Sequence, residues 1–411
     1  MLDSSFFTDP AILSLLSASV VLLAAQFYTA SVFKRQPFPK MKSWVVVKNG
    51  APSVALALKD VGADTTKSLP QPKGADILIR VSHAALNPAD LMFMGYIPTW
   101  LPFRFRPVPG IDFAGEVVAL GPQAGAVASH AAEPLTVGAR VAGCLSVSLV
   151  ATGHGSLVEY LTVPAELVAR QPKVFGNSSA EAGPASAGLL GCAGQTAHLA
   201  ATDPCAEAAF ALSEPRVLIN GASGAVGSLL VQISKARGAR VVGVCSAKNS
   251  EFIRRLGADE VIDYTQHASL PTYLASAPAY TGANSFDLVF DCMGDQDLFV
   301  KSPAFLTPQG AWLSIVGKGI LAPFISARNT MVPAVLGGTP RKYKLMGLSP
   351  SGEQARAVAK WATGDERALV KEMPIDSVYP MAEVKEAYEK QATKRARGKI
   401  IIKVQEDKLD S

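Results

Sequence analysis

Seven residues between an apolar run and a helical pattern carry the clearest chemistry in the chain. The apolar run at 217–219 leads into Gly-Ala-Ser-Gly-Ala-Val-Gly at 221–227, and apolar residues at helical spacing follow over 228–237. Glycines in such a turn let the chain reverse, let the backbone touch a pyrophosphate and let helix and strand pack closely. The N–H groups that begin the helix then face the phosphates. The predicted dinucleotide-binding residues are Ser223, Gly224, Ala225, Val226 and Gly227.

This turn has two alternative interpretations. A purely structural glycine turn is one, because the spacing is GxxGxxG rather than GxGxxG. A second apolar strand at 241–244 completes a strand–turn–helix–strand unit and favours the dinucleotide site. A serine hydrolase is the other, and it is rejected because Ser223 is followed directly by Gly224, whereas a nucleophile elbow reads Gly-x-Ser-x-Gly.

The end of that second strand bears on which dinucleotide binds. NAD sites usually carry an acidic residue about 20 positions beyond the glycines, where it binds the ribose 2′-OH. Here Ser246 stands at that place with Lys248 two residues on, and Tyr264 ends the next strand. Hydroxyls and an ammonium suit a 2′-phosphate, so the pattern favours NADPH. The alternative is NADH, with Lys248 as a solvated loop lysine.

Composition bounds the class of protein. The 411 residues are 49% hydrophobic and 18% charged, which is ordinary for a globular enzyme of two domains. The net charge of +5 is spread along the chain and gives no reason to expect nucleic acid as a partner. The five cysteines include no CxxC pair, which indicates a reducing compartment.

Residues 11–33 contain no charged side chain. As a helix they would be about 34 Å long, enough for a bilayer core of about 30 Å. Asp3 and Asp9 precede them and Lys34 and Arg35 follow, which argues against a cleaved signal peptide and keeps the rest of the chain on the cytosolic side. We therefore expect one N-terminal hydrophobic anchor helix, in a mitochondrial or endoplasmic reticulum membrane. A signal or buried helix is the alternative, since polar residues dilute the run.

The remaining chain divides into patterns of two kinds. Short β-like runs broken by glycine and proline occupy 42–163 and predict a barrel-like β domain. Strands alternate with helices over 171–318, which predicts a doubly wound parallel sheet and an α/β fold. Two helical runs and a closing strand follow, at 352–363, 382–393 and 400–404.

Seven motifs then occur in order along the chain: Asn-Pro-Ala-Asp at 87–90, Pro-Gly-Ile-Asp-Phe-Ala-Gly-Glu-Val at 109–117, Gly-Gln-Thr-Ala at 194–197, the turn at 221–227, Leu-Gly-Ala-Asp at 256–259, Phe-Asp-Cys-Met-Gly at 290–294 and Arg-Gly-Lys at 397–399. Over residues 42–405 the chain resembles the medium-chain dehydrogenase/reductase superfamily, in its zinc-free quinone oxidoreductase branch. Within that branch it is similar to the reticulon-interacting mitochondrial oxidoreductases.

The resemblance implies four segments: an anchor and linker at 1–41, a GroES-like catalytic domain at 42–170, a Rossmann NADPH-binding domain at 171–318, and a return to the catalytic domain at 319–411. Relatives are often dimers, so a homodimer is expected. No stretch of the sequence identifies its interface.

No metal is expected. Zinc-dependent relatives hold the ion through Cys, His and Cys, but here Asn87 and Ile111 stand near two of those places and only Cys192 survives. One thiol cannot hold zinc, so Cys192 is interpreted as a small packing residue.

Site residues around the acceptor are implied by the resemblance. Asn87 would lie beside the nicotinamide and orient the acceptor, and Gly294, Val316 and Gly317 would close around the nicotinamide ribose. Tyr96 is the candidate proton donor, because enoyl-thioester reductases of the superfamily carry a tyrosine near that place. The alternatives are a turn asparagine at position 87 and a loop aromatic at position 96; the quinone reductases' own tyrosine position is Met92 here.

Without a metal, an acceptor that delocalises the added charge is favoured. We therefore expect NADPH-dependent hydride transfer to an apolar quinone or α,β-unsaturated carbonyl. One alternative is an enoyl-thioester reductase for polyketide or fatty-acyl substrates. A non-enzymatic alternative is an NADPH-binding interaction or trafficking protein with little turnover.

Overall fold

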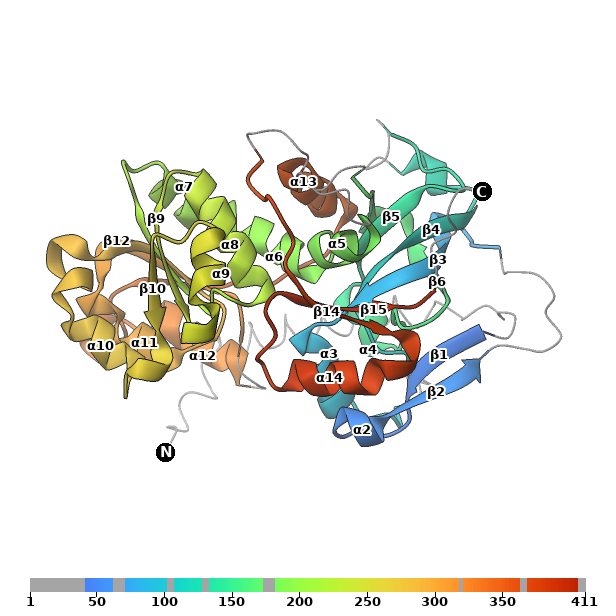
Figure 1. Cartoon of the computed structure of the whole chain (residues 1–411), viewed down its shortest axis with the longest axis horizontal. Helices are drawn as coiled ribbons and strands as arrows, with labels where there is room; N and C mark the ends of the chain where they lie inside the picture. The colour runs from blue at the N-terminus through green and yellow to red at the C-terminus, as the bar shows by residue number, and fades with distance from the viewer. Residues whose placement is uncertain are drawn as a thin grey trace.

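In the computed structural model, two sheets lie side by side, each with its own helices (Figure 1). The structure describes residues 41–61, 71–101, 107–127, 133–172, 182–317, 321–362 and 368–405. A six-stranded parallel sheet fills one half, and a larger, mostly antiparallel sheet fills the other (Figure 1).

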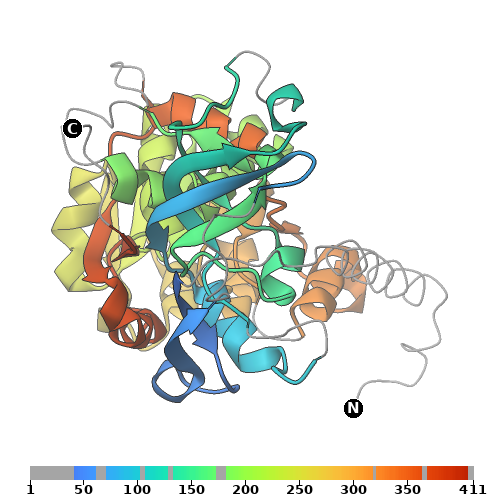
Figure 2. The ribbon, with the colours of Figure 1, turned by 90° about the vertical axis from the view of Figure 1, so that its right-hand side faces the viewer.

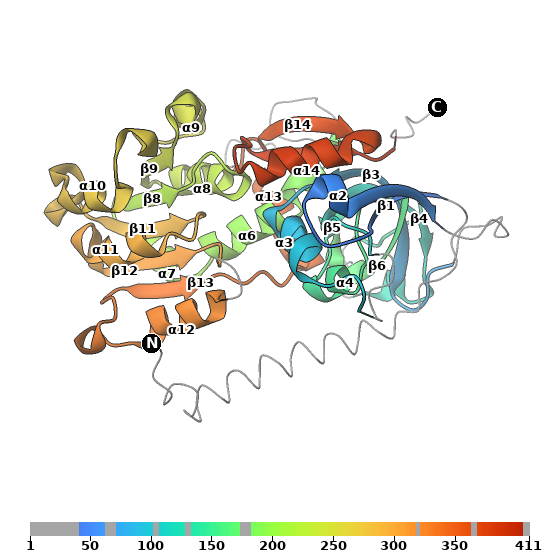
Figure 3. The ribbon, with the colours of Figure 1, turned by 90° about the horizontal axis from the view of Figure 1, so that it is seen from below.

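The six-stranded sheet has the order β10-β9-β8-β11-β12-β13, with every neighbouring pair parallel. Its strands are β8 (Arg216–Asn220), β9 (Arg240–Cys245), β10 (Glu260–Asp263), β11 (Phe286–Asp291), β12 (Leu306–Ser314) and β13 (Lys342–Leu345). This is the doubly wound strand order 3-2-1-4-5-6. All strands run parallel, but successive strands are added on one side of β8 up to β10 and on its other side from β11 onward, so the order reverses between β8 and β11. The sheet extends past residue 318, where the sequence placed the end of the nucleotide-binding domain, because β13 forms its outer edge in Figure 3.

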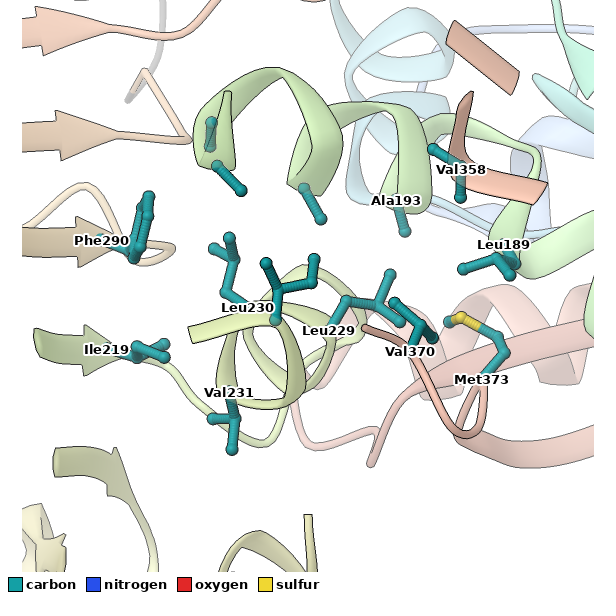
Figure 4. Close-up of a cluster of buried hydrophobic side chains, with 14 of the residues drawn as sticks. Leu189, Ala193, Ile219, Leu229, Leu230, Val231, Phe290, Val358, Val370 and Met373 are labelled. Atoms are coloured by element: carbon teal, nitrogen blue, oxygen red, sulfur yellow. The ribbon is translucent and has the colours of Figure 1, made fainter. Parts of the chain in front are cut away.

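Helices on both faces of this sheet bury its apolar strands. They are α6 (Cys192–Ala201), α7 (Pro204–Phe210), α8 (Ala225–Ala236), α9 (Ser250–Arg255), α10 (Leu270–Ser276), α11 (Gln296–Lys301) and α12 (Ala322–Met331). A further helix, α13 (Gly352–Ala362), packs against α6 and against the other sheet. In Figure 4, Leu229 and Leu230 of α8 lie between Ile219 and Phe290 of the sheet and Ala193 of α6. All five are buried in one cluster, so α8 is held firmly against the strand that precedes its glycine turn.

The second half, which faces the viewer in Figure 2, is built on a seven-stranded sheet. Its order is β14-β15-β3-β4-β5-β7, with β6 paired to β3. Its strands are β3 (Asp76–Ala85), β4 (Asp112–Leu120), β5 (Arg140–Cys144), β6 (Tyr160–Pro164), β7 (Val168–Arg170), β14 (Ile375–Pro380) and β15 (Lys399–Lys403). A separate hairpin pairs β1 (Met41–Val46) with β2 (Leu56–Val61). The helices of this half are α2 (Pro52–Ala55), α3 (Pro88–Tyr96), α4 (Val147–Ala151), α5 (Ala182–Leu189) and α14 (Val384–Ala392).

The chain therefore leaves the β-rich half, forms the parallel sheet and returns with β14 and β15. The predicted α/β fold with a β-rich domain and a doubly wound sheet is confirmed. The anchor predicted over residues 11–33 lies outside the described residues, and the structure gives it no support. None of the helices in the described ranges combines the length and apolar character needed to cross a bilayer.

Candidate functional site

The glycine turn links the carboxyl end of β8 to the start of α8. Gly221 has φ of +84°, a left-handed conformation that favours glycine. A Cβ on Gly227 would lie 2.3 Å from the carbonyl oxygen of Gly221, so that position leaves no room for a side chain. At Gly224, the N-cap of α8, a Cβ would meet only the same oxygen, at 3.5 Å. The open space beside the first N–H groups of α8 fits a pyrophosphate.

The C-terminal return runs beside this turn. The backbone N–H of Gly398 donates to the carbonyl oxygen of Ser223 at 3.0 Å, and Gly398 forms a parallel bridge with Gly224. Ser223, Ala225 and Val226 are half-buried. One short segment of the return thus contacts the predicted phosphate cradle.

The predicted 2′-phosphate residues meet at one edge of the sheet. Cys245 and Asp263 are register partners in the parallel pair of β9 and β10, so both strands end at the same level. Ser246 and Tyr264 are the next residues, and Lys248 lies in the short 3-10 helix that follows Ser246. Lys248 is exposed and Tyr264 is 51% exposed, which leaves both side chains accessible to a ligand.

Sequence reasoning missed a carboxylate at this edge. Asp263 accepts hydrogen bonds from the backbone N–H and the hydroxyl of Thr265, at 3.0 and 2.7 Å. These bonds, with a contribution from the backbone of Ala247, lower the pKa of Asp263. The carboxylate therefore ties the two loops together. The sequence could have indicated Asp263 as a residue of this edge, because it directly precedes Tyr264.

A buried carboxylate organises the point where the strand order reverses. Asp291, at the end of β11, accepts at Oδ1 from Asn220 of β8 and from the backbone N–H groups of Met293 and Gly294, each at 3.0 Å. Its Oδ2 accepts from the N–H of Asp295 at 2.7 Å. Burial raises the pKa of Asp291, against the lowering effect of these bonds. The sequence contained a signal for Asp291, because it is a charged residue at the end of the apolar run of β11.

Gly294, Val316 and Gly317 line one small cavity with Asp291 and Ser314, and residues of α11, α12 and β13 also line it. Ligands of open α/β sheets bind outside the carboxyl ends of strands at the switch point. The structure thus brings together the three residues predicted for the nicotinamide-ribose end.

Asn87 lies in a buried polar cluster with Lys399 and Asp112. The ammonium of Lys399 donates to Asn87 Oδ1 at 2.6 Å, to Asp112 Oδ2 at 2.7 Å and to the carbonyl of Leu86 at 3.1 Å. Asn87 Nδ2 donates to Asp112 Oδ2 at 2.9 Å. Burial opposes the charge on Lys399, but Asp112 and Cys192 outweigh it and raise the Lys399 pKa. Both polar atoms of the Asn87 amide are thus engaged inside the protein.

The same cluster extends into α3 and α14. Asp90 Oδ2 accepts the backbone N–H of Asn87 at 2.8 Å, at the start of α3. Burial raises the pKa of Asp90 to about 7, and the hydroxyl of Tyr388 faces this carboxyl from α14. The entry to α3 is therefore fixed by buried polar contacts that the sequence pattern did not reveal.

Asn87, Ile111 and Cys192, which stand near the zinc-ligand positions of zinc-dependent relatives, do not form a zinc ligand set. Cys192 is the first residue of α6, and its backbone N–H donates to Asp112 Oδ1 at 2.7 Å. Ile111 is a buried aliphatic residue, and the Asn87 amide is engaged as described above. In the described part of the chain no three His, Cys, Asp or Glu side chains cluster as metal ligands. Zinc independence stays a prediction.

Tyr96 lies at the far end of α3 from Asn87. Tyr96 follows Asn87 by nine positions, which is about 13 Å of helix at 1.5 Å per residue. The side chain of Tyr96 is 73% exposed. The loop that follows is held by Asn49, whose Nδ2 donates to the carbonyls of Met94 and Ile97 at 2.9 and 2.8 Å. The structure does not bring the two predicted catalytic residues into contact.

Comparison with known proteins identifies the family of this chain. The alcohol dehydrogenase GroES-like domain matches residues 73–173, and the zinc-binding dehydrogenase family matches residues 256–402. Medium chain reductase pydE of an Acremonium species is 34% identical, over 89% of this chain and 99% of that protein. Trans-enoyl reductase pgmF of Aspergillus terreus is 32% identical, over 89% and 97%. The mitochondrial NAD(P)H oxidoreductase RTN4IP1 of Drosophila melanogaster is 32% identical, over 82% and 80%.

Solved structures agree on the fold. The quinone oxidoreductase of Coxiella burnetii superposes with a TM-score of 0.68 at 24% identity, over 89% of this chain and all of that one. A mycobacterial protein solved with NADPH gives a TM-score of 0.65 at 21% identity, over 88% and 99%. The chain belongs to the medium-chain dehydrogenase/reductase family and is an oxidoreductase of that family, which confirms the resemblance. The prediction of NADPH agrees with these comparisons.

Proposed function

We propose that this oxidoreductase binds NADPH and transfers hydride to a quinone or an α,β-unsaturated carbonyl without zinc. The observation that carries the proposal is the meeting of Ser246, Lys248 and Tyr264 at one sheet edge. Two hydroxyls and one ammonium suit a 2′-phosphate, whereas the nearby Asp263 is engaged by Thr265.

The nicotinamide supplies the hydride, and the protein binds and orients it. The glycine cradle receives the pyrophosphate, and the loop organised by Asp291 receives the ribose beside Gly294, Val316 and Gly317. Asn87 is a positioning residue, because Lys399 and Asp112 hold its amide. A conjugated acceptor suits such a site, since the charge added with hydride delocalises within the acceptor and needs no Lewis acid.

The second candidate is an enoyl-thioester reductase. It is favoured by the similarity to trans-enoyl reductase pgmF, which covers 89% of this chain, the same share as the similarity to medium chain reductase pydE. Both acceptor classes present a conjugated carbonyl, so the same hydride geometry serves either.

The test is turnover of the full chain with NADPH deuterated at the transferred position. A panel of quinones and apolar enones is compared with a panel of enoyl thioesters, and deuterium is located in the product. The proposal expects faster turnover with quinones or enones, with deuterium retained on carbon in the enone product. For quinones, whose new O–H exchanges with water, it expects slower NADPH oxidation with the deuterated cofactor. Faster turnover with thioesters would replace it by the second candidate. Tight NADPH binding without turnover on either panel would indicate the interaction protein.

The homodimer and the membrane contact expected from the sequence stay predictions. Neither is needed for the hydride transfer proposed here.

A further inference from the structure

Two thiols flank the buried carboxylate of Asp112. One belongs to Cys144, the register partner of Asp112 in the antiparallel pair of β4 and β5. Leu145 donates its backbone N–H to the carbonyl of Ile111 at 3.0 Å, so the next pair, Asp112 and Cys144, is of the non-hydrogen-bonded kind. In such pairs the Cα atoms lie about 4.5 Å apart and the two side chains share a face.

The other thiol reaches the same carboxylate from α6. The backbone N–H of Cys192 lies 2.7 Å from Asp112 Oδ1. A Cβ on Gly191 would lie 2.4 Å from Asp112 Cγ, so only glycine lets the start of α6 come this close. The first residue of α6 is therefore held against the face of the sheet that carries Cys144.

The two thiols are neighbours with different access to solvent. Burial, followed by the contact with the Cys192 thiol, raises the pKa of Cys144. Cys144 is 1% exposed, whereas Cys192 is half-buried and lies within electrostatic reach of the Lys399 ammonium. A partly exposed thiol beside a cation is the kind that oxidants attack.

We propose that Cys144 and Cys192 close to a disulfide when a peroxide oxidises the protein. The Cys192 sulfur attacks one peroxide oxygen, the O–O bond breaks, and one water leaves as the sulfenic acid forms. The Cys144 thiol then attacks that sulfur, the S–S bond forms and a second water leaves. The two thiols lose two electrons and two protons, and the hydrogen peroxide that takes them becomes two waters.

The bridge would join the two halves of the molecule. Cys144 ends β5 of the β-rich half, and Cys192 begins α6, which packs against α8 of the nucleotide-binding half. It would form beside Asp112, which holds Asn87 and Lys399. We expect the bridged protein to turn over more slowly and to recover with a dithiol reductant.

The test is peptide mapping of the full chain after mild hydrogen peroxide, alkylation and digestion without reductant. The expected product is a peptide pair linked through Cys144 and Cys192, with two of the five thiols lost. Cys205→Ser is the matched control, because Cys205 is also half-buried but lies on α7, and this variant should form the same link. In Cys144→Ser, a sulfenic acid probe such as dimedone should instead label Cys192.

The proposal is overturned if Cys192 passes to sulfinic acid in the wild type with no linked peptide. It is also overturned if the link involves Cys205 or Cys292. Because Cys144 is buried, Cys192→Ser provides a second variant, and it should keep its four thiols under the same treatment. The linked peptide is measured by mass, so its absence is distinct from a failure of the proposed hydride transfer.

Discussion

The ammonium of Lys399 lies 2.6 Å from Oδ1 of Asn87, although 312 positions separate the two residues in the chain. The contact joins the first residue of the closing strand β15 to the entry of α3, and Asp112 of β4 completes it. Gly398, the residue before Lys399, bonds to the glycine turn. The C-terminal return therefore supports both the cofactor cradle and the asparagine expected beside the acceptor.

Lys399→Met should destabilise the protein strongly. The change leaves Asp112 as a buried carboxylate without its cation, a loss that typically costs about 3–5 kcal/mol. The free energy of unfolding from urea titrations measures it. Lys235→Met is the matched control, because the Lys235–Asp259 pair is 46% and 33% exposed and should contribute no more than about 1 kcal/mol. Equal losses in the two variants would show that the buried cluster has no special role.

Asp90→Asn should remove a pH dependence of stability. Burial raises the pKa of Asp90 from 3.8 to about 7, so between these values the folded chain keeps a proton that the unfolded chain releases. The stabilisation from this group is full below about pH 4 and is lost as the pH rises through 7. The wild type should lose up to about 1.4 kcal/mol per pH unit relative to the variant in this window. Urea titrations from pH 4 to pH 8 test this, and a constant difference would be inconsistent with a protonated Asp90.

Gly227→Ala should disrupt cofactor binding. The new Cβ would lie 2.3 Å from the carbonyl oxygen of Gly221, so the turn must shift. Such overpacking typically costs about 1–3 kcal/mol, and NADPH affinity should fall at least tenfold, about 1.4 kcal/mol. Fluorescence titration with NADPH measures the affinity. In the control Gly125→Ala, where no atom lies within 4 Å of the new Cβ, affinity should be unchanged. Unaltered binding in Gly227→Ala would mean that the phosphates bind elsewhere.

Tyr96→Phe should have little effect on quinone reduction. The side chain is 73% exposed and stands at the opposite end of α3 from Asn87. We expect kcat to fall less than about threefold, far below the roughly 10²–10⁴ that a general acid contributes. Steady-state kinetics on both acceptor panels, with pH profiles, provide the measurement. A hundredfold loss confined to enoyl thioesters would instead identify Tyr96 as the proton donor of an enoyl reductase.

Much of this architecture could be predicted from local patterns. The glycine turn, the apolar strands around it and the polar ends at Ser246 and Tyr264 are short-range features, and parallel strands necessarily bring their carboxyl ends to one edge. The β-rich half was equally visible, because its strands are short and broken by glycine and proline. Strand β13 was missed because its four residues alternate lysine with tyrosine and leucine, a weak signal at the sheet edge.

The parts that could not be predicted depend on long-range contacts between charged side chains. Lys399 sits in a lysine-and-arginine-rich stretch that reads as a solvated surface, and only the fold shows that its ammonium is buried beside Asp112. In the sequence, Asp90 likewise resembles an ordinary carboxylate in the first turn of a helix. Only the fold shows that it is buried beside Tyr388. Both residues are separated from their partners by most of the chain, so no window of the sequence contains the pair.

The central claim is that Lys248 selects the phosphorylated dinucleotide. The most direct measurement is the ratio of dissociation constants for NADPH and NADH in the wild type and in Lys248→Ala. A charge-assisted hydrogen bond is worth about 1.5–3 kcal/mol, so NADPH affinity should fall about tenfold or more while NADH affinity stays nearly constant. If both affinities fall equally, or neither changes, the 2′-phosphate is not held at this sheet edge and the account of the cofactor site is wrong.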